Sequence, residues 1–176
     1  MIEIELYPTP EQHSLLMRTA GYTRYVYNWC LDHLEECRKQ HSESTILELA
    51  KRFSAAKPVW HAETIDQAAY EAFYRMFKLL SFDPSATPGF MKRKDGIWVA
   101  FDAQDVQLAK ASIQICSHVD IKLKAEIPVN VGDACRYLLK HYRDVWTLHI
   151  EDSDPIFEKL RSLLINTEAY CNITAN

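Results

Sequence analysis

Three acidic residues are the first place to look for hydrolytic chemistry. Two-metal cleavage of a phosphodiester needs several carboxylates held together on a rigid scaffold, because both the attacking and the leaving oxygen must be neutralised. Asp120 lies in an alternating segment typical of a strand, but Lys122 and Lys124 follow it on the same face. Asp102 and Asp105 fall in a segment typical of a turn, where acids commonly cap the backbone. The ordinary interpretation of all three is structural, and we expect no catalytic residue.

Thiol and imidazole groups gather near one face of a predicted helix, at Cys30, His33, Cys37 and His41. A tetrahedral zinc site needs ligands from more than one direction, and a straight helix usually supplies only two. The first three residues also lie in an apolar stripe, where buried thiols and a packed imidazole are common. The pair Cys116 and His118 does not change this interpretation. We therefore expect no metal and no cofactor.

Basic and aromatic side chains form a more informative pattern in the second half of the chain. On an antiparallel sheet they would form one basic strip, in which cations contact phosphates and rings stack on bases or sugars. The alternative is a solvated face with ordinary lysines. The candidate nucleic-acid contacts are Lys92, Arg93, Lys94, Lys122, Lys124, Arg136, Lys140, Arg143, Arg18 and Arg24, and the candidate stacking partners are Trp98, Tyr137 and Tyr142. Of these, Arg18 and Arg24 flank a helix-turn-helix-like corner expected at Gly21, which is more often a simple packed hairpin.

Charge and composition limit what such a strip can do. The net charge is -4, whereas a protein that grips nucleic acid over its whole surface is usually basic. The five cysteines are odd in number and form no Cys-x-x-Cys, which is typical of free thiols in a reducing compartment. No stretch approaches the roughly 20 apolar residues of a membrane helix, and the first residues do not form a secretory signal. We expect a cytoplasmic protein with no membrane partner.

The elements that position these residues follow from periodicity. Residues 2–7 alternate as a half-buried strand, and Thr9, Pro10 and Gln12 form the start of a helix that ends or bends at Gly21. The next helix runs to Cys37, and capping boxes at Thr45/Glu48 and Thr64/Gln67 predict two more. After a turn-rich linker the period becomes two. The predicted strands are 97–101, 112–116, 119–127, 136–141 and 146–151, followed by a helix from Asp154-Pro155 to about Leu164.

These elements predict an α+β fold. The opening strand is too short to be stable alone, so we expect it to join the later sheet. The chain is then a small antiparallel β-barrel-like wedge domain (residues 1–8 and 89–152), a helical bundle inserted after the first strand (9–82), and a C-terminal helix and tail (153–176).

Four segments resemble a known family. Leu6–Gln12 and Tyr22–Trp29 resemble the N-terminus of the TnpB proteins, transposon-encoded RNA-guided DNA nucleases related to the type V CRISPR effectors. Pro88–Lys94 is similar to the segment that leads that family from its helices into its strands, and Trp146–Glu151 corresponds to its last wedge-domain strand. The resemblance covers about residues 1–151. It implies a wedge domain and a helical recognition domain that hold the guide RNA and the guide–target duplex.

Two functions follow from this resemblance. The sequence has no counterpart of the family's RNase H-like nuclease domain, so we expect a non-catalytic protein that binds RNA, DNA or a separately encoded RNA-guided nuclease. The alternative is an anti-CRISPR-type inhibitor that mimics part of such a nuclease and blocks it by protein–protein or nucleic-acid-competitive binding, because acidic surface can occupy a basic channel. A DNA-binding repressor that uses the helical corner is a third interpretation, and the oligomeric state stays open.

Overall fold

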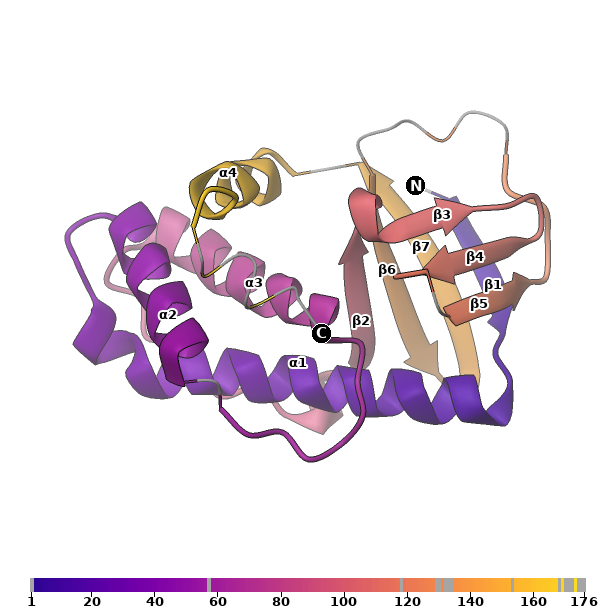
Figure 1. Cartoon of the computed structure of the whole chain (residues 1–176), viewed down its shortest axis with the longest axis horizontal. Helices are drawn as coiled ribbons and strands as arrows, with labels where there is room; N and C mark the ends of the chain where they lie inside the picture. Colours follow the sequence, from indigo (N-terminus) through magenta and orange to yellow (C-terminus); the bar gives the residue numbers. More distant parts are fainter. Residues whose placement is uncertain are drawn as a thin grey trace.

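The chain forms a helical part and a β-sheet that lie side by side, with one long helix running beneath both (Figure 1). The structure, a computed structural model, describes residues 2–56, 58–117, 119–128, 131, 135–152, 154–167, 169 and 173; His118 and Cys171 lie outside the described residues. The elements are β1 (Ile2–Tyr7), α1 (Pro10–Cys37), α2 (Ser42–Ala56), η1 (Asp66–Ala68), α3 (Ala69–Phe82), η2 (Arg93–Asp95), β2 (Ile97–Asp102), η3 (Ala103–Asp105), β3 (Val106–Leu108), β4 (Ser112–Ile115), β5 (Val119–Leu123), β6 (Cys135–Tyr142), β7 (Val145–Asp152) and α4 (Pro155–Leu164), where η marks a short 3-10 helix.

Seven antiparallel strands form one sheet in the order β2-β6-β7-β1-β5-β4-β3. The opening strand lies in its middle: Ile2 pairs with Ile150 of β7, and Leu6 pairs with Leu123 of β5. The prediction that the first strand joins the later ones is therefore confirmed. The sheet also contains β3, a strand of three residues that periodicity did not reveal.

The two edge strands of this sheet are neighbours in sequence. Only η3 separates β2 from β3, and the four Cα steps from Asp102 to Val106 span at most about 14 Å. The sheet must therefore curl until its edges approach each other. No ladder joins β2 to β3 in the described part of the chain, and the carbonyl of Asp105, between them, accepts from the amide of Cys116 (2.7 Å). The predicted β-barrel-like domain is thus corrected to a curled, open sheet.

One continuous helix replaces the two that were predicted before Cys37. The helix α1 spans 28 residues and begins at the predicted cap, where Thr9 and Gln12 exchange side-chain-to-backbone hydrogen bonds of 3.2 and 2.9 Å. The predicted corner at Gly21 is wrong. Ala20 is buried in the core of the sheet and Tyr22 in the core of the helical part, and packing on both sides outweighs the weak helix propensity of glycine.

Two other helix starts also differ from prediction. The helix α2 begins at Ser42, so Thr45 lies inside it, buried, and accepts from the amide of Lys39 (2.9 Å). Before α3 the chain forms η1, and the hydroxyl of Thr64 donates to Asp66 rather than capping a helix (2.7 Å).

The strand predicted for 119–127 ends at Leu123. The cap at Asp154 is confirmed, since its carboxylate accepts from the amide of Ile156 (2.9 Å).

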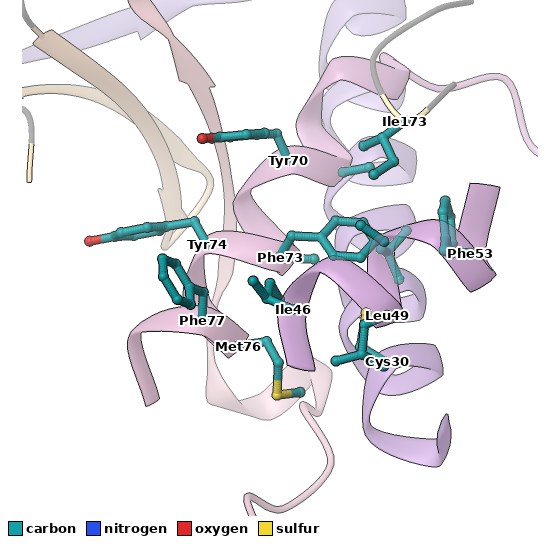
Figure 2. Close-up of a cluster of buried hydrophobic side chains, with 14 of the residues drawn as sticks. Cys30, Ile46, Leu49, Phe53, Tyr70, Phe73, Tyr74, Met76, Phe77 and Ile173 are labelled. Carbon is teal, nitrogen blue, oxygen red and sulfur yellow. The ribbon is translucent and has the colours of Figure 1, made fainter. Parts of the chain in front are cut away.

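The helical part has a hydrophobic core of its own, made by α1 from Tyr22 onward together with α2, α3 and α4. Figure 2 shows Phe73 and Met76 of α3 turned into this core, while the hydroxyl groups of Tyr70 and Tyr74 point away from it. Those two hydroxyls hold α4: Tyr70 donates to the carbonyl of Phe157 (2.9 Å) and Tyr74 to the carboxylate of Asp154 (2.8 Å). The division of the chain into an inserted domain and a wedge domain stays a prediction.

Candidate nucleic-acid interface

The outer face of the sheet carries one row of exposed side chains across four neighbouring strands. Side chains alternate between the two faces of a strand, and those next to each buried residue point outward. Tyr142 of β6 pairs with Val145 of β7, and Tyr7 of β1 pairs with Lys122 of β5. Since Leu6 pairs with Trp146, Tyr7 follows directly beside Val145. We call the outer-face strip this row together with its neighbouring cations: Tyr7, Lys122, Lys124, Lys140, Tyr142, Arg143 and Val145.

The outer-face strip combines exposed rings with free cations. Tyr142 is 69% exposed, Tyr7 52% and Val145 38%, and exposed large side chains of this kind gathered in one place mark interaction surfaces. The guanidinium of Arg143 lies 5.1 Å from the ring centroid of Tyr142. Within the described residues, no carboxylate forms an ion pair with Lys122, Lys140 or Arg143. These three cations are therefore available to phosphates.

Lys124 is the exception among the lysines of the strip. Its ammonium group donates to the carboxylate of Glu5 at 2.9 Å. This hydrogen bond and the charge of Glu5 raise the pKa of Lys124. A phosphate would have to compete with Glu5 for this cation, so Lys124 contributes less to the strip than its charge suggests.

A second basic group extends the strip toward α1. The exposed residues 92–94 overlap η2, which lies beside the end of β6 because Ile97 pairs with His141. Burial lowers the pKa of His141, and the neighbouring His13 and Arg93 lower it further, although the charge of Asp144 opposes them. Burial and the charge of Arg93 likewise lower the pKa of Arg24. Arg24 and Arg93 thus reinforce the positive potential at this end.

Four residues predicted to contact nucleic acid have other partners. Arg136 is 7% exposed and Tyr137 5%, because α3 covers the outer face at Arg136 and Tyr137 points into the core. Trp98 packs beneath the guanidinium of Arg75, 3.4 Å from its ring centroid. Arg18 donates to the carbonyl of Glu63 (2.8 Å). The structure thus places Arg136 and Tyr137 in the interior, where both residues stabilise the fold.

Arg136 is the centre of a buried ionic network. It donates to Glu71 of α3 through two guanidinium nitrogens, one of them at 3.0 Å, and to Glu151 at 2.7 Å. The side chain of Glu71 is 0% exposed and also pairs with Arg75 (3.1 Å). This network fixes α3 against β6 and β7.

A hollow of about 570 Å³ opens beside the strip, within the size range of ordinary ligand pockets. Its walls come from residues 5–10, from His13 and Ser14 of α1, and from residues 144–146 of the β6–β7 hairpin. The indole of Trp146 donates to Nδ1 of His13 (2.9 Å). Because tryptophan can only donate, Nδ1 of His13 is the acceptor and the ring carries its N–H on Nε2.

Sequence reasoning missed two residues of this surface, Tyr7 and Val145. Both were placed in or beside predicted strands. The signal was the alternation itself, because Ile4 and Leu6 turn inward and Tyr7 must then turn outward, where a ring has no core to enter.

The connection between α1 and α2 forms a second basic hollow, of about 550 Å³. Lys39, His41 and Lys51 line it together with Gln40, Ser44, Leu47 and Glu48. Arg52 of the same helix is already paired with Glu36 (2.8 Å) and Glu48 (3.2 Å). We call this the α1–α2 hollow.

The candidate zinc ligands do not converge. Cys30 and Cys37 are buried in the helical core, where burial raises the pKa of both thiols, and His33 stacks on Trp29 at 4.0 Å between ring centroids. In the described part of the chain, no three His, Cys, Asp or Glu side chains are grouped so that they could hold a metal ion. Asp120 is exposed on β5, while Asp102 pairs with Arg161.

The described helices include none with the length and apolar character needed to cross a membrane. Residues 2–43 match the family model for the OrfB proteins of IS605 elements, described as a helix-turn-helix domain. This match places the N-terminal segment in the TnpB/IS605 OrfB family and confirms the resemblance there. No curated protein matches the chain.

The matched segment contains β1, α1 and the connection to α2. In the structure α1 is continuous through Gly21, and the matched segment ends two residues into α2. A helix-turn-helix domain suggests nucleic-acid binding.

Proposed function

We propose that the protein binds the RNA of a TnpB-type mobile element through the outer-face strip and does not cleave it. One observation carries the proposal: Tyr7 and Tyr142 are exposed in the same row as Lys122, with Lys140 and Arg143 beside them. Aromatic rings on a sheet stack on bases, and adjacent cations neutralise phosphates. The family match supports nucleic acid as the ligand, and the family's guide RNA supports RNA in particular.

The test compares two surfaces of the same protein. Binding of a fluorescein-labelled RNA containing a hairpin with single-stranded flanks is measured by anisotropy for the wild type and two double variants. The first, Lys122→Glu with Lys140→Glu, inverts the strip, and the second, Lys39→Glu with Lys51→Glu, makes the same charge change at the α1–α2 hollow. We expect at least a tenfold loss for the first and less than twofold for the second. Equal affinity of the first variant and the wild type would refute the proposal.

The α1–α2 hollow provides the contrasting result. If duplex DNA binds more tightly than RNA and the Lys39/Lys51 variant alone loses affinity, the α1–α2 hollow is the binding surface. The protein is then a duplex-DNA-binding protein of the repressor kind.

A second candidate function is inhibition of an RNA-guided nuclease by protein contact. It is favoured by exposed apolar side chains at the end of α3 and in the following segment, at Leu79, Phe82 and Phe90, and by the net charge of -4. In a cleavage assay with a TnpB-type nuclease, wild-type protein in excess would then block cleavage, and Phe82→Glu would restore it. Unimpaired cleavage in the presence of excess wild-type protein excludes this function.

A further inference from the structure

We infer that the hollow beside Tyr7 receives one unpaired guanine of the bound RNA, stacked on the Tyr7 ring and recognised by the carboxylate of Asp144. The inference rests on the proposed function and specifies its ligand. Tyr7 and Asp144 both line this hollow, and Val145 and Trp146 continue its wall. The flanking cations Lys122 and Arg143 lie where phosphates on either side of the base would pass.

The two-residue β6–β7 turn carries two charged side chains. The two turn residues have positive φ, 50° at Arg143 and 64° at Asp144. Two-residue hairpins of this kind favour Asn-Gly, since glycine takes positive φ at no steric cost. Among residues other than glycine, aspartate is one of those that adopt positive φ most readily. Here the side chains are a cation beside Tyr142 and an acid in the wall of the hollow.

The hydrogen-bonding groups in the wall of the hollow favour guanine over the other bases. Within the described residues, Asp144 forms no ion pair, whereas Glu5 is held by Lys124. A carboxylate accepts two parallel hydrogen bonds from the N1–H and N2–H groups of guanine. Cytosine, adenine and uracil each present only one donor group on the corresponding edge. Ser14 and the Nε2–H of His13 add donors to the same wall for O6 of guanine.

The same geometry requires an unpaired base. Watson–Crick pairing would occupy the edge that Asp144 contacts, and a base inside a helix cannot stack on Tyr7. Proteins that recognise RNA sequence generally bind splayed bases in this manner. The ligand is therefore a single-stranded or looped segment that contains guanine.

The experiment uses octamers of uridine with one central guanosine, inosine, adenosine or cytidine, and a blunt RNA duplex. Inosine keeps N1–H and O6 but lacks the N2 amino group. We expect the guanosine octamer to bind about tenfold more tightly than the inosine octamer, and the duplex to bind more weakly than either. Asp144→Asn should remove the preference for guanosine, and Tyr7→Ala should weaken binding of all octamers by about tenfold.

Ser117→Asn is the matched control. Ser117 is exposed and has the same φ of 64° in the turn between β4 and β5. Asparagine tolerates this conformation, so both Asn variants should melt like the wild type in circular dichroism. Ser117→Asn should keep the preference for guanosine.

The outcomes separate the two proposals. Equal binding of the guanosine and inosine octamers, with binding still lost in the Lys122/Lys140 variant, overturns the guanine site and leaves the proposed function intact. No binding of any RNA overturns both.

Discussion

Buried charged residues differ most between the role that the sequence suggested and the contacts that the structure shows. Arg136 was predicted to contact a ligand, and instead it neutralises Glu71 across the contact between α3 and the sheet. Its partner lies 65 positions away in sequence, and no local pattern reveals a pair so distant. Removing one member of a buried pair leaves the other charge uncompensated.

Arg136→Met should therefore lower the free energy of unfolding by about 2–3 kcal/mol, less than a fully isolated pair would lose because Glu71 keeps Arg75. Urea denaturation measures this change. Lys140→Met on the same face of β6, at an exposed position, is the control and should change stability by less than about 0.5 kcal/mol. Equal effects of the two variants would contradict the ionic network.

Asp105 gives a prediction with a definite pH dependence. Burial and the charge of Asp102 raise the pKa of Asp105 to about 6, although Arg161 opposes them. A carboxyl group with a raised pKa in the folded protein binds its proton more tightly there, so its ionisation destabilises the fold as pH rises through 6.

Asp105→Asn should accordingly stabilise the protein at pH 7.5, by about 1 kcal/mol after allowance for partial exposure. The gain should shrink as pH falls below 6 and vanish near pH 4, where both states hold the proton. Urea titrations at several pH values test this. The exposed Asp120→Asn is the control, and a gain in Asp105→Asn that does not depend on pH would refute the explanation.

At the scale of elements, local patterns predicted strand and helix types better than helix boundaries. Alternation in residues 2–7 predicted β1, and the cap at Thr9 predicted the start of α1. The break at Gly21 was wrong because both flanking residues are held by separate cores. The strand β3 was missed because three residues are too few to show a period.

Gly21→Ala tests the continuity of α1 directly. A Cβ at Gly21 would meet Arg24 and Trp60 at 3.6 Å, which is ordinary contact. Alanine in a helix interior is favoured over glycine by about 0.5–1 kcal/mol, so the midpoint of urea unfolding should rise. Gly96→Ala is the contrasting variant, because Gly96 has a φ of +128° and should lose stability. Destabilisation by Gly21→Ala would favour a break in the helix.

At the scale of the whole molecule, the acidic balance and the basic strip are compatible if binding depends on few phosphates. The resemblance and the alternation predicted five of the seven strip residues, but not the curl of the sheet or the helix that covers Arg136. Both depend on contacts between segments far apart in the chain. Side-chain exposure is a property of the assembled fold, so the sequence alone does not separate the exposed cations from the buried Arg136.

The few free cations predict a shallow salt dependence. Each phosphate contact on a single strand contributes about -0.7 to the slope of log affinity against log salt. Lys122, Lys140 and Arg143 therefore predict a slope of about -2, and Lys122→Glu should reduce its magnitude by about 0.7 or more. Anisotropy titrations at salt concentrations between about 50 and 300 mM measure this slope. A slope steeper than about -5 would mean that a larger basic surface, including residues 92–94, carries the binding.

The central position of β1 affects the order in which the chain is completed during synthesis. β1 is made before both of its partner strands, and one of them is β7, residues Val145–Asp152. A ribosome that adds about 5–20 residues per second needs on the order of ten seconds to reach it. Throughout that interval the nascent chain holds an unpartnered strand edge beside a helix that has already formed. A newly made molecule is therefore exposed to misassociation until β7 has been made.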